Sequence, residues 1–165
     1  MDKKAIIAII LVVALVAVGT IMVWGMNPSG GDDDGLVSVI DANGRTVTTD
    51  EAPTRIVSCS PSMTEIVYAL GIGDRLVGVT DYCDWPADVN DRKANGSLTV
   101  TGGYFTPSVE GIIAAEGDLI MVDKGVQAQM DMLPQLNNTG QKYIVLDKGT
   151  TFDEVYVTIM MVGEI

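Results

Sequence analysis

The stretch Arg55-Ile-Val-Ser-Cys-Ser-Pro-Ser-Met-Thr-Glu65 places a short apolar segment directly before a helix start. Residues 55–59 have the length and composition of a buried strand. Ser60 then offers a helix N-cap, and Pro61 occupies the first helical position, where its missing N–H leaves no hydrogen bond unmade. A strand that runs directly into a helix predicts an α/β fold.

The same alternation continues along the chain. Pro134 should kink or end a helix, and Thr151 with Glu154 forms a capping box that opens another. We expect further strands at 76–80, 119–122 and 143–146, and helices from Ser60-Pro61, from Thr106-Pro107, over 127–137 and from Thr151 onward. This order predicts a mainly parallel sheet flanked by helices.

Two segments precede this region. Val37, Val39 and Val47 alternate with polar residues around Asn43-Gly44, which predicts a short β-ribbon with an Asn-Gly turn. Residues 27–35 contain no apolar side chain to bury and predict a flexible linker. The folded lobe is expected over 36–150, followed at 151–165 by a helix that is still running at the last residue, which suggests truncation.

Residues 1–26 are expected to be a signal anchor or a signal peptide. The run from Ala5 to Trp24 is apolar apart from Gly19 and Thr20, and about 20 such residues span a bilayer. An anchor is favoured, because the run continues beyond a possible cleavage site at 17–19 and no cysteine follows to carry a lipid. Basic residues before the run and acidic residues after it place the lobe outside the cytoplasmic membrane, in the periplasm or at the cell surface, anchored or secreted.

Charge and composition exclude several classes of function. The 165 residues include 22 acidic and 10 basic side chains and no histidine. Binding of nucleic acid needs clustered Lys and Arg, so it is set aside. Without histidine the chain lacks the usual general base and the commonest zinc ligand, so we expect no enzyme activity, no metal site and no cofactor.

Three aromatic residues fall on loops at or near one edge of the predicted sheet. Tyr82 and Trp85 follow the second strand, and Tyr104 precedes a helix. Ligands of parallel α/β sheets gather at the carboxyl ends of the strands. These side chains would suit a flat, apolar ligand with a polar rim, although they could simply cover the sheet edge.

Cys59 and Cys83 follow the first two strands of the predicted sheet. If those strands are neighbours, the two side chains can approach closely enough for a disulfide, which an outside location favours. Reduced thiols are the next alternative. A redox or metal role comes last, because no Cys-x-x-Cys spacing is present.

Three motifs follow one another in a characteristic order and spacing: residues 55–65, Ala69-Leu-Gly-Ile-Gly-Asp-Arg-Leu-Val-Gly-Val79 and Asp84-Trp-Pro86. Two more follow, Pro107-Ser-Val-Glu110 and Gly117-Asp-Leu-Ile120. Together they resemble the periplasmic-binding family for cobalamin, haem and iron-siderophores of ABC importers. The resemblance runs from about Val37 to the end and implies a Rossmann-like first lobe, joined by a long helix to a second lobe.

The resemblance also implies roles for single residues. Tyr82 and Tyr104 match aromatic residues that line the ligand cleft, and the loop Ser60, Pro61 and Ser62 matches the loop that faces the ligand. Glu110 matches a carboxylate that docks on the membrane permease. From the sequence alone, the simpler interpretation of Glu110 is a first-turn glutamate stabilised by the helix dipole.

These observations lead to three hypotheses. The first is a substrate-binding protein that captures cobalamin or chelated iron, as a siderophore or haem, and delivers it to the transmembrane subunits of an ABC permease. The second is a membrane-anchored interaction or sensor domain that retains only the first lobe and does not transport. The third is a thiol redox enzyme that uses Cys59 and Cys83.

Overall fold

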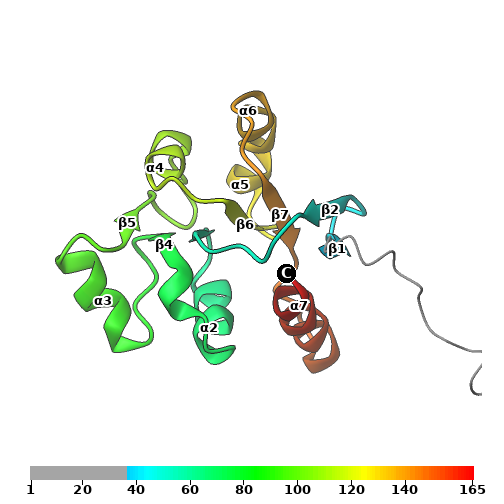
Figure 1. Ribbon diagram of the computed structural model, residues 1–165, viewed down its shortest axis with the longest axis horizontal. Coiled ribbons are helices and arrows are strands. Elements are labelled where there is room, and N and C mark those ends of the chain that lie inside the picture. The colour runs from blue at the N-terminus through cyan, green and yellow to red at the C-terminus, as the bar shows by residue number, and fades with distance from the viewer. Residues whose placement is uncertain (1–36) are drawn as a thin grey trace, which may run out of the picture. The chain divides into compact units, whose positions relative to one another are not determined.

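Five parallel strands form a sheet at the centre of the structure (Figure 1). The computed structural model describes residues 37–165. In chain order the strands are β3 (Ile56–Ser58), β4 (Leu76–Val79), β5 (Thr99–Val100), β6 (Leu119–Asp123) and β7 (Tyr143–Leu146). Their order in space is β5-β4-β3-β6-β7. The chain therefore moves outward from β3 to β5 and then returns to the other side of β3, so that the order of strands reverses between β3 and β6.

Helices cover both faces of this sheet (Figure 1). One face carries α4 (Val109–Ala114), α5 (Gln127–Asp131) and α6 (Leu133–Asn138), and the other carries α2 (Pro61–Ala69), α3 (Ala87–Ala94) and α7 (Phe152–Glu164). A short 3-10 turn, η1 (Gly73–Arg75), leads into β4. Covering both faces explains why the strands read as continuous apolar runs and not as alternating patterns.

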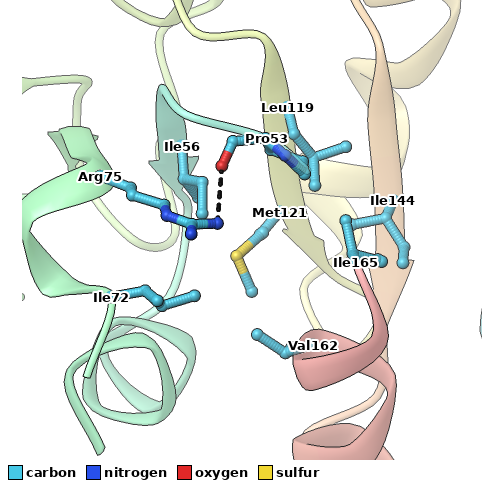
Figure 2. Close-up of a pocket in the computed structure, with 9 residues that line it drawn as sticks. All are labelled: Pro53, Ile56, Ile72, Arg75, Leu119, Met121, Ile144, Val162 and Ile165. Atoms are coloured by element: carbon cyan, nitrogen blue, oxygen red, sulfur yellow. Dashed lines mark hydrogen bonds between the residues drawn. The ribbon is translucent and has the colours of Figure 1, made fainter. Parts of the chain in front are cut away.

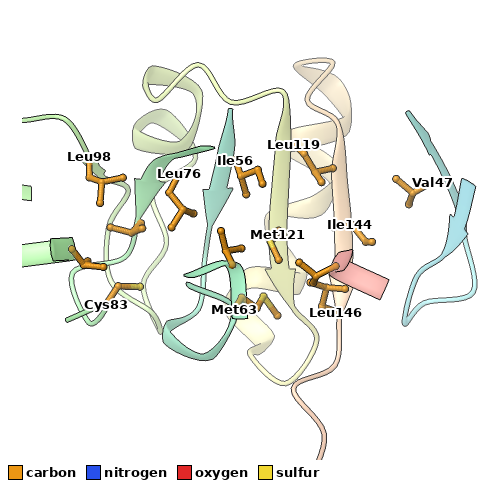
Figure 3. Close-up of a cluster of buried hydrophobic side chains, with 14 of the residues drawn as sticks. Val47, Ile56, Met63, Leu76, Cys83, Leu98, Leu119, Met121, Ile144 and Leu146 are labelled. Carbon is orange, nitrogen blue, oxygen red and sulfur yellow. The ribbon is translucent and has the colours of Figure 1, made fainter. Parts of the chain in front are cut away.

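The core consists of two apolar layers separated by the sheet. On the α2/α7 face, Met63 and Val67 of α2 pack with Ile56, Leu76 and other strand residues (Figure 3). On the opposite face, residues of α4 and α6 pack on alternate residues of the same strands, including Val57, Ile120 and Val145. All residues of β3, β6 and β7 are buried. Burial of each large aliphatic side chain contributes about 1.5–3 kcal/mol, which makes these layers the main stabilising term.

An antiparallel hairpin, β1 (Val37–Ile40) and β2 (Thr46–Thr49), lies beside β7 (Figure 1). Gly44 in its turn has a φ of +75°, which glycine adopts without strain. The buried carboxylate of Asp41 accepts hydrogen bonds from the Arg45 guanidinium at 2.7 Å and from the Val145 N–H at 3.3 Å. The Ala42 N–H donates to the Val145 carbonyl at 2.8 Å. Asp41 thereby joins the hairpin to the sheet.

The structure confirms the α/β architecture, the β-ribbon and the four predicted strands. The capping box of Thr151 and Glu154 at the start of α7 is present, and the predicted helix at 127–137 divides in two, with Pro134 in the first turn of α6. The helix start predicted at Thr106-Pro107 was wrong by two residues. Pro107 forms a β-bridge with Gly102, and Ser108 is the residue that caps α4.

Helix α3, strand β5 and the 3-10 turn η1 were not predicted. Helix α3 has only Val89 buried, so its sequence has no apolar stripe. The turn η1 has three residues, too few to give a pattern. Strand β5 has two residues, too few to give a pattern.

The predicted signal anchor or signal peptide and the linker lie outside the described residues. Among residues 37–165, no helix is both long and apolar enough to cross a bilayer.

The substitution Asp41→Asn should destabilise the lobe. Burial alone would raise the pKa of Asp41, but hydrogen bonds from Arg45 and Val145 hold this pKa below its usual range. A carboxyl group with a lowered pKa stabilises the fold at neutral pH, and this contribution is lost as the pH falls below about 3.9 through the lowered value. We expect a loss of about 1–3 kcal/mol at pH 7 in urea unfolding, and a weaker acid destabilisation than in the unmodified chain. The exposed Asp50→Asn control should match the unmodified chain; equal losses in both variants would contradict this role.

Candidate functional site: the carboxyl edge of the sheet

The carboxyl ends of β3 and β6 meet at the point where the strand order reverses. In parallel α/β sheets this switch point opens a crevice between loops that leave in opposite directions. Ser60 follows β3 and Asp123 ends β6, and the Ser60 hydroxyl lies 3.3 Å from the Asp123 carboxylate. The loops after β4 and β5 reach the same edge, because the Asp81 N–H donates to the Gly102 carbonyl at 3.0 Å.

Three aromatic rings pack together at this edge. The ring centroids of Tyr82 and Tyr104 are 6.4 Å apart, and those of Tyr104 and Phe105 are 4.6 Å apart. Tyr82 also meets Phe105 edge-on at 6.1 Å. Tyr82 and Phe105 are 57% and 61% exposed, whereas Tyr104 is buried. We call these three residues the aromatic wall; it offers two exposed rings supported by a third.

Two members of this wall, Tyr82 and Tyr104, were predicted at or near this edge, and the structure brings their rings together. Phe105, the residue after Tyr104, was not predicted, although its aromatic side chain on the same loop was a signal for it. Trp85 is 64% exposed on the same loop as Tyr82 but lies outside the ring cluster. Its role in ligand binding stays a prediction.

The buried carboxylate of Asp123 organises the loops beneath the wall. The Tyr104 hydroxyl donates to Oδ2 at 2.7 Å, and the Gly125 N–H donates to Oδ1 at 2.8 Å. Gln129 accepts from the Asp123 N–H at 2.9 Å and donates to the carbonyls of Cys59 and Tyr104. The side chains of Asp123 and Gln129 therefore connect loops from three strands.

Asp123 and Gln129 were not predicted as site residues. One signal was present, since Leu119-Ile-Met-Val-Asp123 is an apolar strand that ends on an acidic residue at a ligand-binding edge. Gln129 carried no signal, because a glutamine in a short helix usually faces solvent.

The predicted loop of Ser60, Pro61 and Ser62 lies next to this network. Ser60 occupies the N-cap position of α2, but its hydroxyl makes no cap hydrogen bond. It lies 3.0 Å from the Ser62 hydroxyl and also contacts Asp123. Pro61 and Ser62 are partly exposed. The structure places the loop beside the wall, and contact with a ligand stays a prediction.

Lys148 completes the edge from β7. Its ammonium donates to the Tyr104 hydroxyl at 3.2 Å and lies 5.7 Å from the ring centroid. Burial and the hydrogen bond to Asp123 raise the pKa of Tyr104, and the bond to Tyr104 raises the pKa of Lys148. At neutral pH the phenol is thus neutral and the amine charged.

The predicted disulfide is not formed, because Cys59 and Cys83 are both free and buried. Their strands are neighbours, as expected, but Cys59 packs into the core layer of α4 and α6, whereas Cys83 packs into the layer of α2. The Cys83 sulfur lies 3.2 Å from the hydroxyls of Thr64 and Thr80. Burial, with the nearby Cys83 and Asp123, raises the pKa of Cys59 to about 12, which disfavours a reactive thiolate.

Glu110 is exposed in the first turn of α4. Ser108 caps that helix through a hydrogen bond from the Gly111 N–H. Within residues 37–165, no hydrogen bond or ion pair occupies the Glu110 carboxylate. Glu110 is accessible, and its docking role stays a prediction.

A small apolar pocket lies at the opposite edge of the sheet, between the starts of β3 and β6 and the end of α7 (Figure 2). The Arg75 guanidinium donates to the Pro53 carbonyl there at 3.1 Å. None of the predicted site residues lines this pocket, so it is separate from the aromatic wall. Nor does the described part of the chain hold a cluster of acidic residues and cysteines that could bind a metal ion.

Comparisons with known proteins agree with this architecture. The family model described as periplasmic binding protein matches residues 56–165. An uncharacterized ABC transporter substrate-binding lipoprotein of Bacillus subtilis is 36% identical over 129 residues, which cover 78% of this chain and 39% of that protein.

Solved structures give the same result. The periplasmic vitamin B12 binding protein of Vibrio cholerae matches 67% of this chain and 40% of its own, with a TM-score of 0.55 and 30% identity. A periplasmic haem binding protein of Pseudomonas aeruginosa matches 68% of this chain and 38% of its own, with a TM-score of 0.60; at 24% identity it shows the fold alone. The chain thus spans about two fifths of the length of these proteins.

Neither cysteine should react in the folded protein. Because Cys59 and Cys83 are buried and the pKa of Cys59 is about 12, we expect a thiol reagent to label neither at pH 8 and both after unfolding in guanidinium. The mass of the chain, isolated without reductant and measured after unfolding, should not change on reduction. A gain of about 2 Da corresponds to one hydrogen added to each sulfur of a disulfide. This gain would show that Cys59 and Cys83 form a disulfide and would contradict the free thiols.

Proposed function

The chain belongs to the periplasmic binding protein family, and we propose that it forms the first ligand-binding lobe of an extracytoplasmic substrate-binding protein that serves an ABC importer. Residues 36–150 form the lobe in this proposal, and 151–165 begin the helix that joins it to a second lobe. The protein captures its ligand outside the cytoplasmic membrane, either anchored or secreted, and catalyses no reaction.

One observation carries this proposal: two exposed aromatic rings stand on a buried polar network at the switch point of a parallel sheet. Contiguous apolar rings are unfavourably exposed to water, so a surface of this kind indicates a site that a ligand or partner covers. Tyr104 is fixed by its hydrogen bonds to Asp123 and Lys148, so the wall is preorganised before any ligand arrives. A preorganised wall loses little conformational entropy on binding.

The ligand we propose is cobalamin or chelated iron, in the form of a siderophore or haem. These molecules present broad apolar faces with polar edges, which the wall of Tyr82, Tyr104 and Phe105 can cover. The name of the Vibrio cholerae relative, 30% identical, supports the corrinoid. A single lobe covers one side of such a ligand, so this chain should bind more weakly than a two-lobed protein.

The alternative, an interaction or sensor domain, is favoured by a different surface. Helix α7 exposes Phe152, Tyr156, Val157 and Met160, each more than half accessible. This surface faces away from the core and would suit a protein partner. Ligand titration distinguishes the two functions, because the interaction domain requires no response to corrinoids or ferric chelates.

Removal of an exposed ring from the wall should weaken ligand binding. We expect Tyr82→Ala to raise the Kd of the full chain for cyanocobalamin, haemin or a ferric siderophore, whichever binds, by about tenfold, measured by calorimetry. Tyr156→Ala is a matched control, since Tyr156 is similarly exposed but lies beside β1. Equal effects of the two substitutions, or the absence of binding by all three ligands, would refute the proposal.

Glu110 should contribute to docking and not to ligand affinity. Glu110→Gln should leave the ligand Kd unchanged and weaken binding to the reconstituted permease by about fivefold, because a rim carboxylate loses its pairing with a basic partner surface. The control Glu51→Gln removes an exposed charge at the opposite edge of the sheet. If both variants bind the permease like the unmodified chain, the docking role is wrong.

A further inference from the structure

The Lys148 ammonium stands beside the aromatic wall without a carboxylate partner. Lys148 is exposed, two residues beyond the end of β7, and donates to the Tyr104 hydroxyl at 3.2 Å. Within residues 37–165 it takes part in no ion pair. The neighbouring Asp147 carboxylate accepts from the Gly149 N–H at 3.1 Å. Two of the three N–H groups of Lys148 therefore remain available to a ligand.

Asp123 fixes the direction of the hydrogen bond that holds Lys148. A phenol has one O–H donor, and Tyr104 gives it to Asp123 at 2.7 Å. The Tyr104 oxygen must then accept from Lys148. Asp123 itself is fully buried and also accepts from Ser60 and from the Gly125 N–H. The buried carboxylate thus holds the ammonium at the edge without contacting it.

The other lysines near this edge donate hydrogen bonds to backbone carbonyls. Lys93 donates to the carbonyls of Asp81 and Cys83, the latter at 2.6 Å. Lys124 donates to the Ala42 carbonyl at 2.7 Å in the hairpin. Lys148 is the lysine at this edge that contacts the aromatic wall.

We propose that Lys148 binds an anionic oxygen group of the ligand while the ring system of that ligand lies on Tyr82 and Phe105. This inference rests on the proposed function and narrows its ligand class to a flat ring system that carries anionic oxygen at its edge. Among the candidates, it favours haem, whose ring edge bears two propionates, over cobalamin, whose ring edge bears uncharged amides. A carboxylate paired with an ammonium forms a charge-assisted hydrogen bond, which discriminates against a neutral ester.

The test compares haemin with its dimethyl ester, in which both propionates are neutral methyl esters, for binding to the full chain and its variants. Lys148→Gln should raise the Kd for haemin by about tenfold and leave the Kd for the ester within about twofold. Lys148→Arg should retain the preference for haemin. Tyr104→Phe, which keeps the ring and removes the hydroxyl, should weaken haemin binding by about threefold, because Lys148 is no longer held in place.

Lys142 provides the matched control, because it is an exposed lysine at the other end of β7. Lys142→Gln should bind both ligands like the unmodified chain. Equal weakening of haemin and its ester by Lys148→Gln, or no weakening of either, overturns the proposal.

A second measurement decides the role of Lys148 if the unmodified chain binds neither haemin nor its ester, a result that would count against tetrapyrrole binding in the proposed function. The side-chain nitrogen signal of Lys148 is then followed by NMR during titration with 2-naphthoate and with 2-naphthamide. A shift with the acid alone, absent in Lys148→Gln, supports the anion site. No shift with the acid, or the same shift with the amide, overturns it.

Discussion

The carboxylate of Asp123 is the constraint on which the carboxyl edge of the sheet depends. A buried charge is costly unless donors surround it, so the fold must deliver donors to this point. They come from Ser60 after β3, Tyr104 after β5, and Gly125 after β6 itself. One buried group therefore sets the relative positions of loops that are far apart in the sequence, and it does so where the strand order reverses.

The aromatic wall follows from that constraint. Because its hydroxyl is held by Asp123, the Tyr104 ring has one orientation, and Tyr82 and Phe105 pack on it at fixed angles. Gln129 supports the same loop through the Tyr104 carbonyl. The exposed rings thus stand on a polar base that satisfies its own hydrogen bonds, which is how a surface can present apolar area and remain rigid.

Features encoded by neighbouring residues were predictable from the sequence, and features encoded by distant contacts were not. The junction of β3 and α2 could be predicted because Ser60 and Pro61 are adjacent residues that indicate a helix start. The capping box indicated the start of α7 in the same way. The start of α4 moved because Gly102 pairs with Pro107 across the loop. The predicted disulfide was wrong because the adjacency of β3 and β4 does not determine on which face of the sheet Cys59 and Cys83 pack. Asp123 and Tyr104 are 19 residues apart, and only the sheet order shows that they meet.

Three groups at this edge keep a fixed protonation state near neutral pH. Burial, with the nearby Cys83 and Asp123, raises the pKa of Cys59 to about 12. Burial and the hydrogen bond to Asp123 raise the pKa of Tyr104, and the hydrogen bond to Tyr104 raises the pKa of Lys148. Each group is held in one protonation state across the physiological range, with a neutral thiol, a neutral phenol and a charged ammonium. The edge therefore presents the same apolar area and the same positive charge across this pH range. A ligand that recognises this pattern should bind it without a change of protonation.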